Sequence, residues 1–348
     1  MSNKERINLA GTSISEIEHH ITPHGLKPFR ARQIFSWIYK RACFDFAGMT
    51  DISRPTRELL ASNFSVTFPT VTAQEVEETG TRKIALSLED GHVIEAVLIP
   101  DRRHDTICLS TQVGCPLRCA FCLSGAKGFK RNLEPHEIIG QFLILRPKEW
   151  PERPVNAVLM GMGEPCLNLD SVRKAVSILK DELGTALSWR RTTLSTAGVV
   201  PAIRAFREWK PRPKLAISIN AASDEVRSRI MPINKKYPLK ELMAELKSFP
   251  LRRGERITFE YVLMKKINDS VDEAKRLASL IRGIPSKINL IPMNPLEEKS
   301  FKPPGEETIQ AFEEVLRRKG FTVVRRRSRG TSISAACGQL AMRNGVRS

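Results

Sequence analysis

The sequence lacks any apolar run long enough to cross a bilayer, and its polar first residues, 1–6, contain no signal-peptide core. We therefore expect a cytoplasmic protein with no membrane partner. The chain contains no convincing internal repeat and no low-complexity tract. Its seven cysteines are an odd number and gather mostly in one short stretch, which is not typical of a disulfide framework. Metal binding or catalysis explains them better.

Acidic residues are too few to balance the basic ones. The 348 residues include 56 lysines and arginines but only 38 aspartates and glutamates, which gives a formal net charge of +18. Such a charge favours a polyanionic partner, and nucleic acid fits better than a membrane surface. Hydrophobic residues make up 41% of the chain, enough for the core of one large domain, alone or with a small accessory domain.

The first part of the chain, residues 1–75, is predicted to be a small helical accessory domain. Ser13 and Glu16 have the spacing of a helix capping box. Basic residues lie between the apolar positions that follow, and they suit either RNA phosphates or a solvated helix face. The apolar residues at helical spacing are Phe29, Ile34, Phe35 and Ile38.

A β-hairpin is predicted next, in a connector that spans residues 76–105. Its strands, 84–88 and 93–99, alternate in hydrophobicity on either side of the turn dipeptide Asp90-Gly91. We expect this hairpin to join the helical domain to the rest of the chain.

From residue 106 to residue 348 the sequence alternates between strand and helix patterns. Strands separated by helices imply a parallel sheet, so the predicted fold class is α/β. Six strands suit a partial (β/α)6 barrel, in which functional residues are expected at the carboxyl ends of the strands. The predicted strands are 107–111, 157–161, 192–196, 215–220, 257–263 and 288–292.

Three cysteines, Cys115, Cys119 and Cys122, are predicted to lie on one loop just after the first barrel strand. A four-iron cluster held by three cysteines keeps one iron open, whereas structural zinc sites and electron-transfer clusters usually have four protein ligands. Zinc-site cysteines normally come as two separated pairs, so a cluster is the better interpretation. The alternative is a zinc site closed by Cys108 or a distant histidine, although the six histidines have no ligand spacing of their own.

The motif Gly161-Met-Gly-Glu-Pro165 follows an apolar strand. It would place backbone groups and the carboxylate of Glu164 at the end of that strand, where they could bind a cationic amine. The alternative is that the motif is a tight turn that needs glycine for its backbone conformation. The motif is neither a Walker loop nor a dinucleotide fingerprint, because it lacks the Lys-Ser/Thr ending and has Cys166 in place of a third glycine.

These motifs resemble the radical S-adenosylmethionine (SAM) superfamily, whose signature is this three-cysteine spacing with an aromatic residue, here Phe121, before the last cysteine. Within it, the sequence is similar to the family of adenine-C2 RNA methyltransferases called RlmN. The resemblance implies a radical SAM barrel with a 4Fe–4S cluster on the three cysteines, and SAM as methyl donor and radical source. The similar segments are 27–34, 108–115, 128–133, 161–165, 232–237, 289–292 and 335–341.

The chemistry of the base explains why such an enzyme needs a radical. C2 of adenine is an electron-poor carbon that will not attack the methyl group of SAM as an ordinary nucleophile, whereas a carbon radical can add to it.

By resemblance, Cys337 accepts the methyl group on sulfur and forms a transient covalent link to RNA. Cys108 then attacks that sulfur, releases the methylated base and leaves a disulfide, and Glu95 accepts the C2 proton. Alone, the two cysteines would be typical of buried apolar positions and Glu95 of an exposed hairpin.

The resemblance also assigns residues to the cofactor. The chain departs from the family at Asn220, where many relatives have histidine, although asparagine can still form hydrogen bonds. It departs again at residues 331–334, Thr-Ser-Ile-Ser, where familiar members carry acidic residues. Cys43 and Cys166 match no role and are interpreted as structural. The positions that match SAM contacts are Gly163, Glu164, Ser195, Ser218, Ile219, Asn220 and Asn294.

Membership would imply two RNA substrates: an adenosine in the peptidyl-transferase region of 23S rRNA and the adenosine beside the anticodon of certain tRNAs. We also expect an electron donor such as flavodoxin and a monomeric chain. Two alternatives stay open. A close branch of the family methylates C8 of adenine with the same cysteines, and a zinc-stabilised RNA-binding module would explain the charge without catalysis.

Overall fold

The computed structural model describes residues 6–147, 150, 152–294, 301–326 and 329–340, and ten strands form its central sheet. The strands are β3 (Thr70–Val76), β4 (Arg82–Ser87), β5 (Val93–Ile99), β6 (Asp105–Cys108), β9 (Val155–Leu159), β10 (Thr192–Thr196), β11 (Lys214–Ser218), β12 (Ile257–Leu263), β13 (Ser286–Pro292) and β14 (Thr322–Arg325). Their order is β14-β13-β12-β11-β10-β9-β6-β5-β4-β3. Strands β6 and β9 to β14 run parallel, whereas β3, β4, β5 and β6 pair antiparallel in turn.

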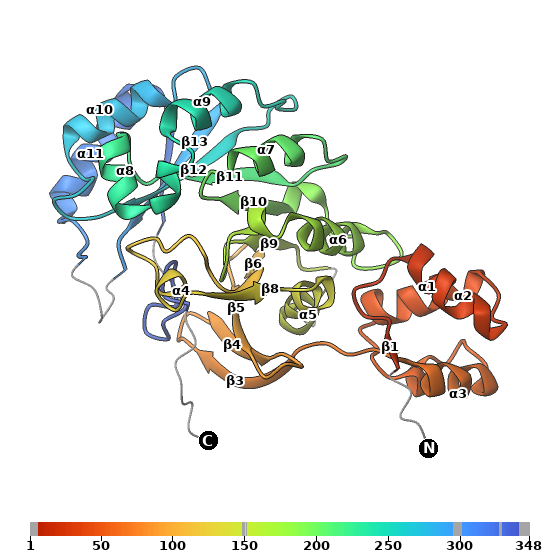
Figure 1. Cartoon of the computed structure of the whole chain (residues 1–348). Helices are drawn as coiled ribbons and strands as arrows, with labels where there is room; N and C mark the ends of the chain where they lie inside the picture. Colours follow the sequence, from red (N-terminus) through yellow and green to blue (C-terminus); the bar gives the residue numbers. More distant parts are fainter. Residues whose placement is uncertain (1–5, 148–149, 151, 295–300, 327–328, 341–348) are drawn as a thin grey trace.

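Helices follow the parallel strands and line the outside of the sheet (Figure 1). Strand β12 is buried at six of its seven residues, as expected of a parallel strand covered on both faces. The helices are α5 (Pro135–Leu145), α6 (Leu169–Lys180), α7 (Val200–Arg207), α8 (Asp224–Ile230), α9 (Leu239–Lys247), α10 (Val271–Leu280) and α11 (Glu306–Arg318), with short 3-10 turns η4 (Pro165–Leu167), η5 (Trp189–Arg191) and η6 (Pro232–Lys235).

A separate group of helices forms the N-terminal part and lies beside α5 and α6 (Figure 1). Its elements are β1 (Ile7–Asn8), α1 (Ile14–Ile21), η1 (Thr22–His24), α2 (Phe29–Phe35), the π-helical η2 (Ser36–Lys40), η3 (Phe46–Gly48), α3 (Arg54–Asn63) and β2 (Phe64–Ser65), with β1 and β2 paired in parallel. The capping box is confirmed, because the Ser13 side chain accepts the Glu16 N–H and Glu16 accepts the Ser13 N–H at 2.7 Å. The predicted helical spacing from Phe29 to Ile38 is also confirmed.

The N-terminal helices share one hydrophobic core with the sheet. Phe35 and Tyr39 are fully buried in that core, and each buried aromatic side chain contributes about 1.5–3 kcal/mol. Two polar contacts add to it: Lys174 Nζ of α6 lies 2.6 Å from a Glu16 oxygen, and Arg146 donates to the Tyr39 carbonyl at 3.1 Å. These contacts fix the N-terminal helices against the side of the sheet.

The parallel part of the sheet differs from the prediction in two strands. It contains seven strands rather than six, because β14 was not predicted; this strand is four residues long and half exposed, so its hydrophobic pattern is weak. The first predicted strand, 107–111, is also shifted. β6 ends at Cys108, and β7 (Gln112–Gly114) starts a separate hairpin with β8 (Phe129–Asn132).

The predicted hairpin around Asp90-Gly91 is confirmed as β4 and β5. Because β5 pairs with β6, the hairpin is continuous with the main sheet. Residues 70–75, which were expected at the end of the helical domain, belong to β3 on the other side of β4. The division into domains at 1–75, 76–105 and 106–348 stays a prediction.

Gly114 at the end of β7 has a backbone conformation and surroundings that only glycine tolerates. Its φ is +75°, and a Cβ atom there would lie 1.7 Å from the Gly128 carbonyl oxygen. That oxygen accepts the N–H of the next residue, Cys115, at 3.0 Å. A side chain at Gly114 would therefore displace the start of the cysteine loop.

We predict that Gly114→Ala lowers the free energy of unfolding by about 3 kcal/mol, because positive φ and overpacking both oppose the methyl group. The matched control is Gly91→Ala, which has a φ of +81° but no atom within 4 Å of the added Cβ, and should cost about 1 kcal/mol. Urea denaturation of the metal-free protein measures both. Equal losses for the two variants would contradict the prediction.

Candidate active site

Two adjoining cavities open at the carboxyl ends of the parallel strands. The larger has a volume of about 410 Å³ and the smaller a volume of about 170 Å³. Functional residues of α/β barrels are expected at this edge of the sheet. Several residues line both cavities, so the two are neighbours: Cys122, Met160, Gly161, Ile291, Asn294, Arg326, Cys337 and Gly338.

Cys115, Cys119 and Cys122 all line the smaller cavity. They lie between β7 and helix α4 (Leu123–Ala126), one short strand later than predicted. Backbone hydrogen bonds shape the loop: the Cys122 N–H donates to the Cys119 carbonyl at 3.2 Å, and the Ala120 N–H donates to the Ile230 carbonyl of α8 at 2.9 Å. The sequence motif therefore folds into one loop that presents three sulfur atoms to one cavity.

The chemistry of this donor set fits an iron–sulfur cluster better than a single zinc ion. Burial raises the pKa of the Cys115 thiol to about 12 and raises that of Cys119 well above its usual range, so the thiols are protonated without a metal. A cluster can bind each thiolate through a different iron. A structural zinc ion usually takes four protein ligands around one point, whereas this loop supplies three cysteines.

Glu164 lies at the start of η4, directly after β9, and is buried against backbone N–H groups. Its carboxylate accepts the Cys166 N–H at 3.0 Å and the Ala197 N–H at 2.8 Å. Burial nevertheless raises the pKa of this carboxyl. Gly163 before it has a φ of +102°, and a Cβ there would lie 2.6 Å from the Gln112 Cβ. The turn thus needs glycine, and it places Glu164 in the wall of the smaller cavity.

The other predicted cofactor residues lie at the ends of β10, β11 and β13. Ser195, Ser218, Asn220 and Asn294 line the smaller cavity, whereas the Ile219 side chain is fully buried in the core. The Asn220 side chain is occupied by protein contacts, since its oxygen accepts the Val262 N–H at 2.9 Å and its nitrogen donates to the Met231 sulfur at 3.2 Å.

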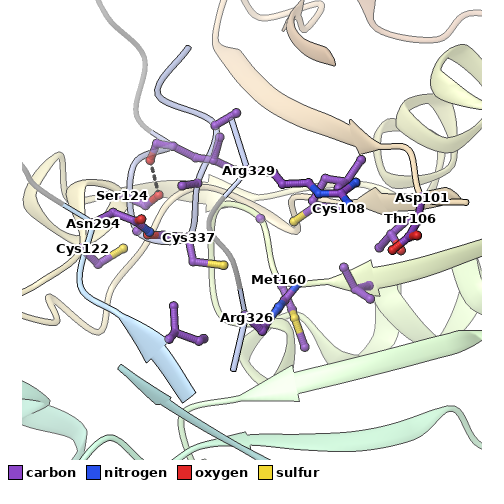
Figure 2. Close-up of a pocket in the computed structure, with 18 of the residues that line it drawn as sticks. Asp101, Thr106, Cys108, Cys122, Ser124, Met160, Asn294, Arg326, Arg329 and Cys337 are labelled. Atoms are coloured by element: carbon purple, nitrogen blue, oxygen red, sulfur yellow. Dashed lines mark hydrogen bonds between the residues drawn. The ribbon is translucent and has the colours of Figure 1, made fainter. Parts of the chain in front are cut away.

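Cys108 and Cys337 line the larger cavity although they are far apart in sequence. Figure 2 shows their sulfur atoms directed into the cavity from different sides, with Arg326 near both. Both thiols are free. The Cys337 carbonyl accepts a hydrogen bond from Asn294 at 3.1 Å, which fixes the loop beside β13.

Arg326 is the cation that faces both of these thiols, and the sequence analysis did not identify it. Burial raises the pKa of Cys108 to about 12 and also raises that of Cys337, while the Arg326 guanidinium opposes both shifts. Its Nη1 also lies 3.9 Å from the buried carboxylate of Glu260. The only sequence signal for Arg326 is its place in a basic run shortly before Cys337.

Glu95 lies on β5 and is not among the described residues that line the two cavities. It is buried, not exposed, and Lys83 Nζ of β4 lies 3.5 Å from its carboxylate. Because Val97 pairs with Cys108 across β5 and β6, Glu95 lies on the same face of the sheet as Cys108.

The remaining sequence features have defined places. Within residues 331–334, the Ser332 hydroxyl donates to Glu77 at 2.9 Å, so an acidic residue at that position would repel Glu77. Cys166 is buried beside Glu164, and the Cys43 thiol donates to the Asp45 carbonyl at 3.2 Å. Ala341, the last residue of a motif similar to the family, lies outside the described residues.

Comparison with known proteins connects this geometry to a family. The model of the radical SAM superfamily matches residues 109–278, and that of the ribosomal RNA large subunit methyltransferase N-terminal domain matches residues 7–66. The sequence is 45% identical to the dual-specificity RNA methyltransferase RlmN of Geobacter sulfurreducens, over 96% of this chain and 92% of that protein. It is 46% identical to RlmN of Rhodospirillum rubrum, over 97% and 81%. A crystal structure of a radical SAM methyltransferase from Sphaerobacter thermophilus superimposes with a TM-score of 0.92 at 38% identity, over 96% of this chain and 99% of that one.

The raised pKa of Cys108 predicts slow alkylation of the metal-free protein. At pH 8 we expect iodoacetamide to modify Cys108 at least about a hundredfold more slowly than it modifies glutathione, because little thiolate is present at a pKa of about 12. The rate should rise about tenfold per pH unit above pH 8. Timed alkylation with peptide mass spectrometry measures it, and the urea-unfolded chain is the control. A fast rate that does not change above pH 8 would contradict the prediction.

Proposed function

The chain belongs to the RlmN family of the radical SAM superfamily, and we propose that it forms 2-methyladenosine in 23S rRNA and in tRNA through a methylated cysteine. It is a SAM-dependent radical RNA methyltransferase. The observation that carries the proposal is the arrangement of five cysteines: Cys115 and Cys119 line the smaller cavity, Cys108 lines the larger one, and Cys122 and Cys337 line both.

The family uses a 4Fe–4S cluster and SAM, and we assign both to residues of the smaller cavity. Cys115, Cys119 and Cys122 would hold the cluster and leave one iron without a protein ligand. When bound, the two groups together supply a methyl group and a 5′-deoxyadenosyl radical. Gly163 and Glu164 would bind the methionine part of SAM, since a buried carboxylate suits its ammonium group. The other contacts are assigned to Ser195, Ser218, Ile219, Asn220 and Asn294.

The side chains of two assigned residues limit how they can take part. Ile219 is buried in the core, and the amide of Asn220 is bonded to Val262 and Met231. Asn220 would therefore contact the cofactor through backbone atoms at the end of β11, whereas the Ile219 carbonyl already accepts from Arg227 and Ala221. This explains how asparagine can stand where many relatives have histidine.

Cys337 is the residue that we propose accepts the methyl group. Its thiol must first lose a proton, and the charge of Arg326 favours the thiolate against the effect of burial. The thiolate attacks the methyl carbon of SAM, the bond from that carbon to the sulfonium sulfur breaks, and S-adenosylhomocysteine leaves while a methyl thioether forms on Cys337. The methyl group on Cys337 then gives one hydrogen atom to the 5′-deoxyadenosyl radical that the bound groups would supply. The carbon radical left on the Cys337 side chain adds to C2 of adenine, which joins protein to RNA and leaves the unpaired electron on the base.

Release of the product needs a base and a second thiol. Glu95 accepts the C2 proton; Lys83 Nζ lies 3.5 Å from its carboxylate and 2.9 Å from that of Glu75. The unpaired electron on the adduct would return to the oxidised cluster. The Cys108 thiolate then attacks the Cys337 sulfur, the bond from that sulfur to the methylene carbon on the base breaks, a disulfide forms, and the methylene carbon takes up a proton to become the methyl group.

The RNA substrates are proposed to bind through the excess of basic side chains. The N-terminal helices present Lys27, Arg32 and Lys40 on exposed positions, within a region similar to a ribosomal RNA methyltransferase domain. Within the described residues, none of the helices is both long and apolar enough for a membrane span. We propose a cytoplasmic monomer that receives electrons from a donor such as flavodoxin.

Methylation at C8 uses the same cysteines, so the regiochemistry requires a direct test. The relatives that share 45–46% identity are named for the dual specificity of RlmN, which favours C2.

We predict that rRNA and tRNA from a strain lacking this protein regain 2-methyladenosine when the wild-type gene is supplied, but not when Cys115→Ala is supplied. Nucleoside mass spectrometry measures the product. Cys43→Ala is the matched control and should retain activity. Formation of 8-methyladenosine would establish the C8 alternative. If the wild-type protein methylates neither RNA, the proposal is refuted.

The role of Cys108 predicts a trapped intermediate. In Cys108→Ala the thiol that releases the product is absent, so protein covalently joined to RNA should accumulate and migrate slowly on a denaturing gel until ribonuclease is added. The double variant Cys108→Ala/Cys337→Ala should form no such species, because the methyl acceptor is missing. An adduct in the double variant, or none in the single variant, would assign these steps to other residues.

A further inference from the structure

Arg227 of α8 is completely buried, and within the described residues no carboxylate forms an ion pair with it. All its hydrogen bonds go to neutral acceptors. Its Nε donates to the Ile219 carbonyl at 3.0 Å, and its Nη2 donates to the Ala197 carbonyl at 2.6 Å and more weakly to that of Ser218 at 3.4 Å. Its Nη1 donates to Asn234 Oδ1 at 2.8 Å. A buried charge without a counter-ion is costly, so its presence requires an explanation.

The position of Arg227 places its charge beside the cysteine loop. The carbonyls that it binds belong to the ends of β10 and β11, and these strand ends line the smaller cavity with the three cysteines. The end of α8 binds the loop directly, since the Ile230 carbonyl accepts the Ala120 N–H at 2.9 Å. Ile230 and Met231 also share a small apolar cluster with Cys115 and Cys119.

One anionic side chain is linked to Arg227, and it acts through an intermediary: Asn234 donates to Asp224 at 2.9 Å while it accepts from Arg227. Asp224 is exposed, and water screens an exposed carboxylate, so it offsets the buried charge only weakly. On the other side, the Ala197 carbonyl that binds Arg227 belongs to a residue that lines the cavity with the three cysteines and shares the apolar cluster of Cys115. The guanidinium charge therefore lies beside the cysteine-lined cavity.

We propose that Arg227 is the fixed counter-charge of the iron–sulfur cluster and raises its reduction potential; this rests on the cluster site proposed above. Three thiolates give the oxidised cluster a net negative charge, and one electron from a low-potential donor makes it more negative. A buried cation stabilises the more negative state, because the protein interior screens charges weakly. The same guanidinium binds the carbonyls at the strand ends that would contact SAM. Arg227 is therefore a positioning residue: it touches neither SAM nor RNA and affects the reaction through the charge beside the cluster and through the backbone that it holds.

A purely structural role is the rival explanation, and the reduction potential separates the two. The test uses the full chain, reconstituted anaerobically with iron and sulfide without SAM, and a mediated redox titration followed by electron paramagnetic resonance. For Arg227→Met we expect the equilibrium constant of one-electron reduction to fall about tenfold, a potential about 59 mV more negative. Arg227→Lys keeps the charge and should stay close to the wild type.

Two further variants separate charge from stability. Asp224→Asn removes an anion that partly offsets Arg227, so it should shift the potential in the opposite, positive direction and by less. Arg212→Met is the matched control, since Arg212 is equally buried but bonds Glu255 at 2.7 Å, before the start of β11 and away from the cavity. It should lose stability while the potential of its cluster stays unchanged.

A wild-type potential in Arg227→Met would overturn this inference alone. If Arg227→Met does not fold or holds no cluster, Asp224→Asn decides: a positive shift supports the inference, and an unchanged or more negative potential overturns it. A shift of equal size in Arg212→Met would also overturn it, because the effect would then be a general consequence of lost stability. If the wild type itself takes up no cluster, the proposed function fails and this inference fails with it.

Discussion

The attachment of the C-terminal loop to helix α4 is the interaction on which the site depends. The Leu123 N–H donates to the Gly338 carbonyl at 2.9 Å, and the Ser124 hydroxyl donates to the Leu340 carbonyl, across 216 residues of sequence. These bonds hold Cys337 next to the loop that carries Cys122. A methyl-accepting thiol has to lie beside the cofactor that supplies the methyl group, and this contact between distant segments creates that proximity.

Burial has opposite effects on the proposed chemistry. An enclosed site keeps water away from reactive intermediates, which radical chemistry requires. The same enclosure raises the pKa of Cys108, Cys115 and Cys337, although thiolates are the reactive and metal-binding forms. Two buried or half-buried arginines counter this effect from different sides. Arg326 faces the pair Cys108 and Cys337, and Arg227 faces Cys119.

The antiparallel strands at one edge of the sheet extend the site beyond the parallel barrel. Because β5 pairs with β6, the face of the sheet that carries Cys108 continues to Glu95, and the next strand adds Lys83. A carboxylate and its counter-ion are thereby built into rigid strands near the larger cavity.

The sequence by itself determined the features that depend on neighbours a few residues apart. The capping box at Ser13, the hairpin around Asp90-Gly91, the strands 192–196 and 257–263 and the spacing of the three cysteines follow from local propensity and periodicity. Family motifs added the identity of Cys108 and Cys337 as candidates. The tertiary structure alone decided that β14 completes the sheet, that Glu95 is buried, and that Arg326 and Arg227 face thiols. Those features depend on burial and on contacts between distant segments, and neither leaves a periodic signal in the sequence.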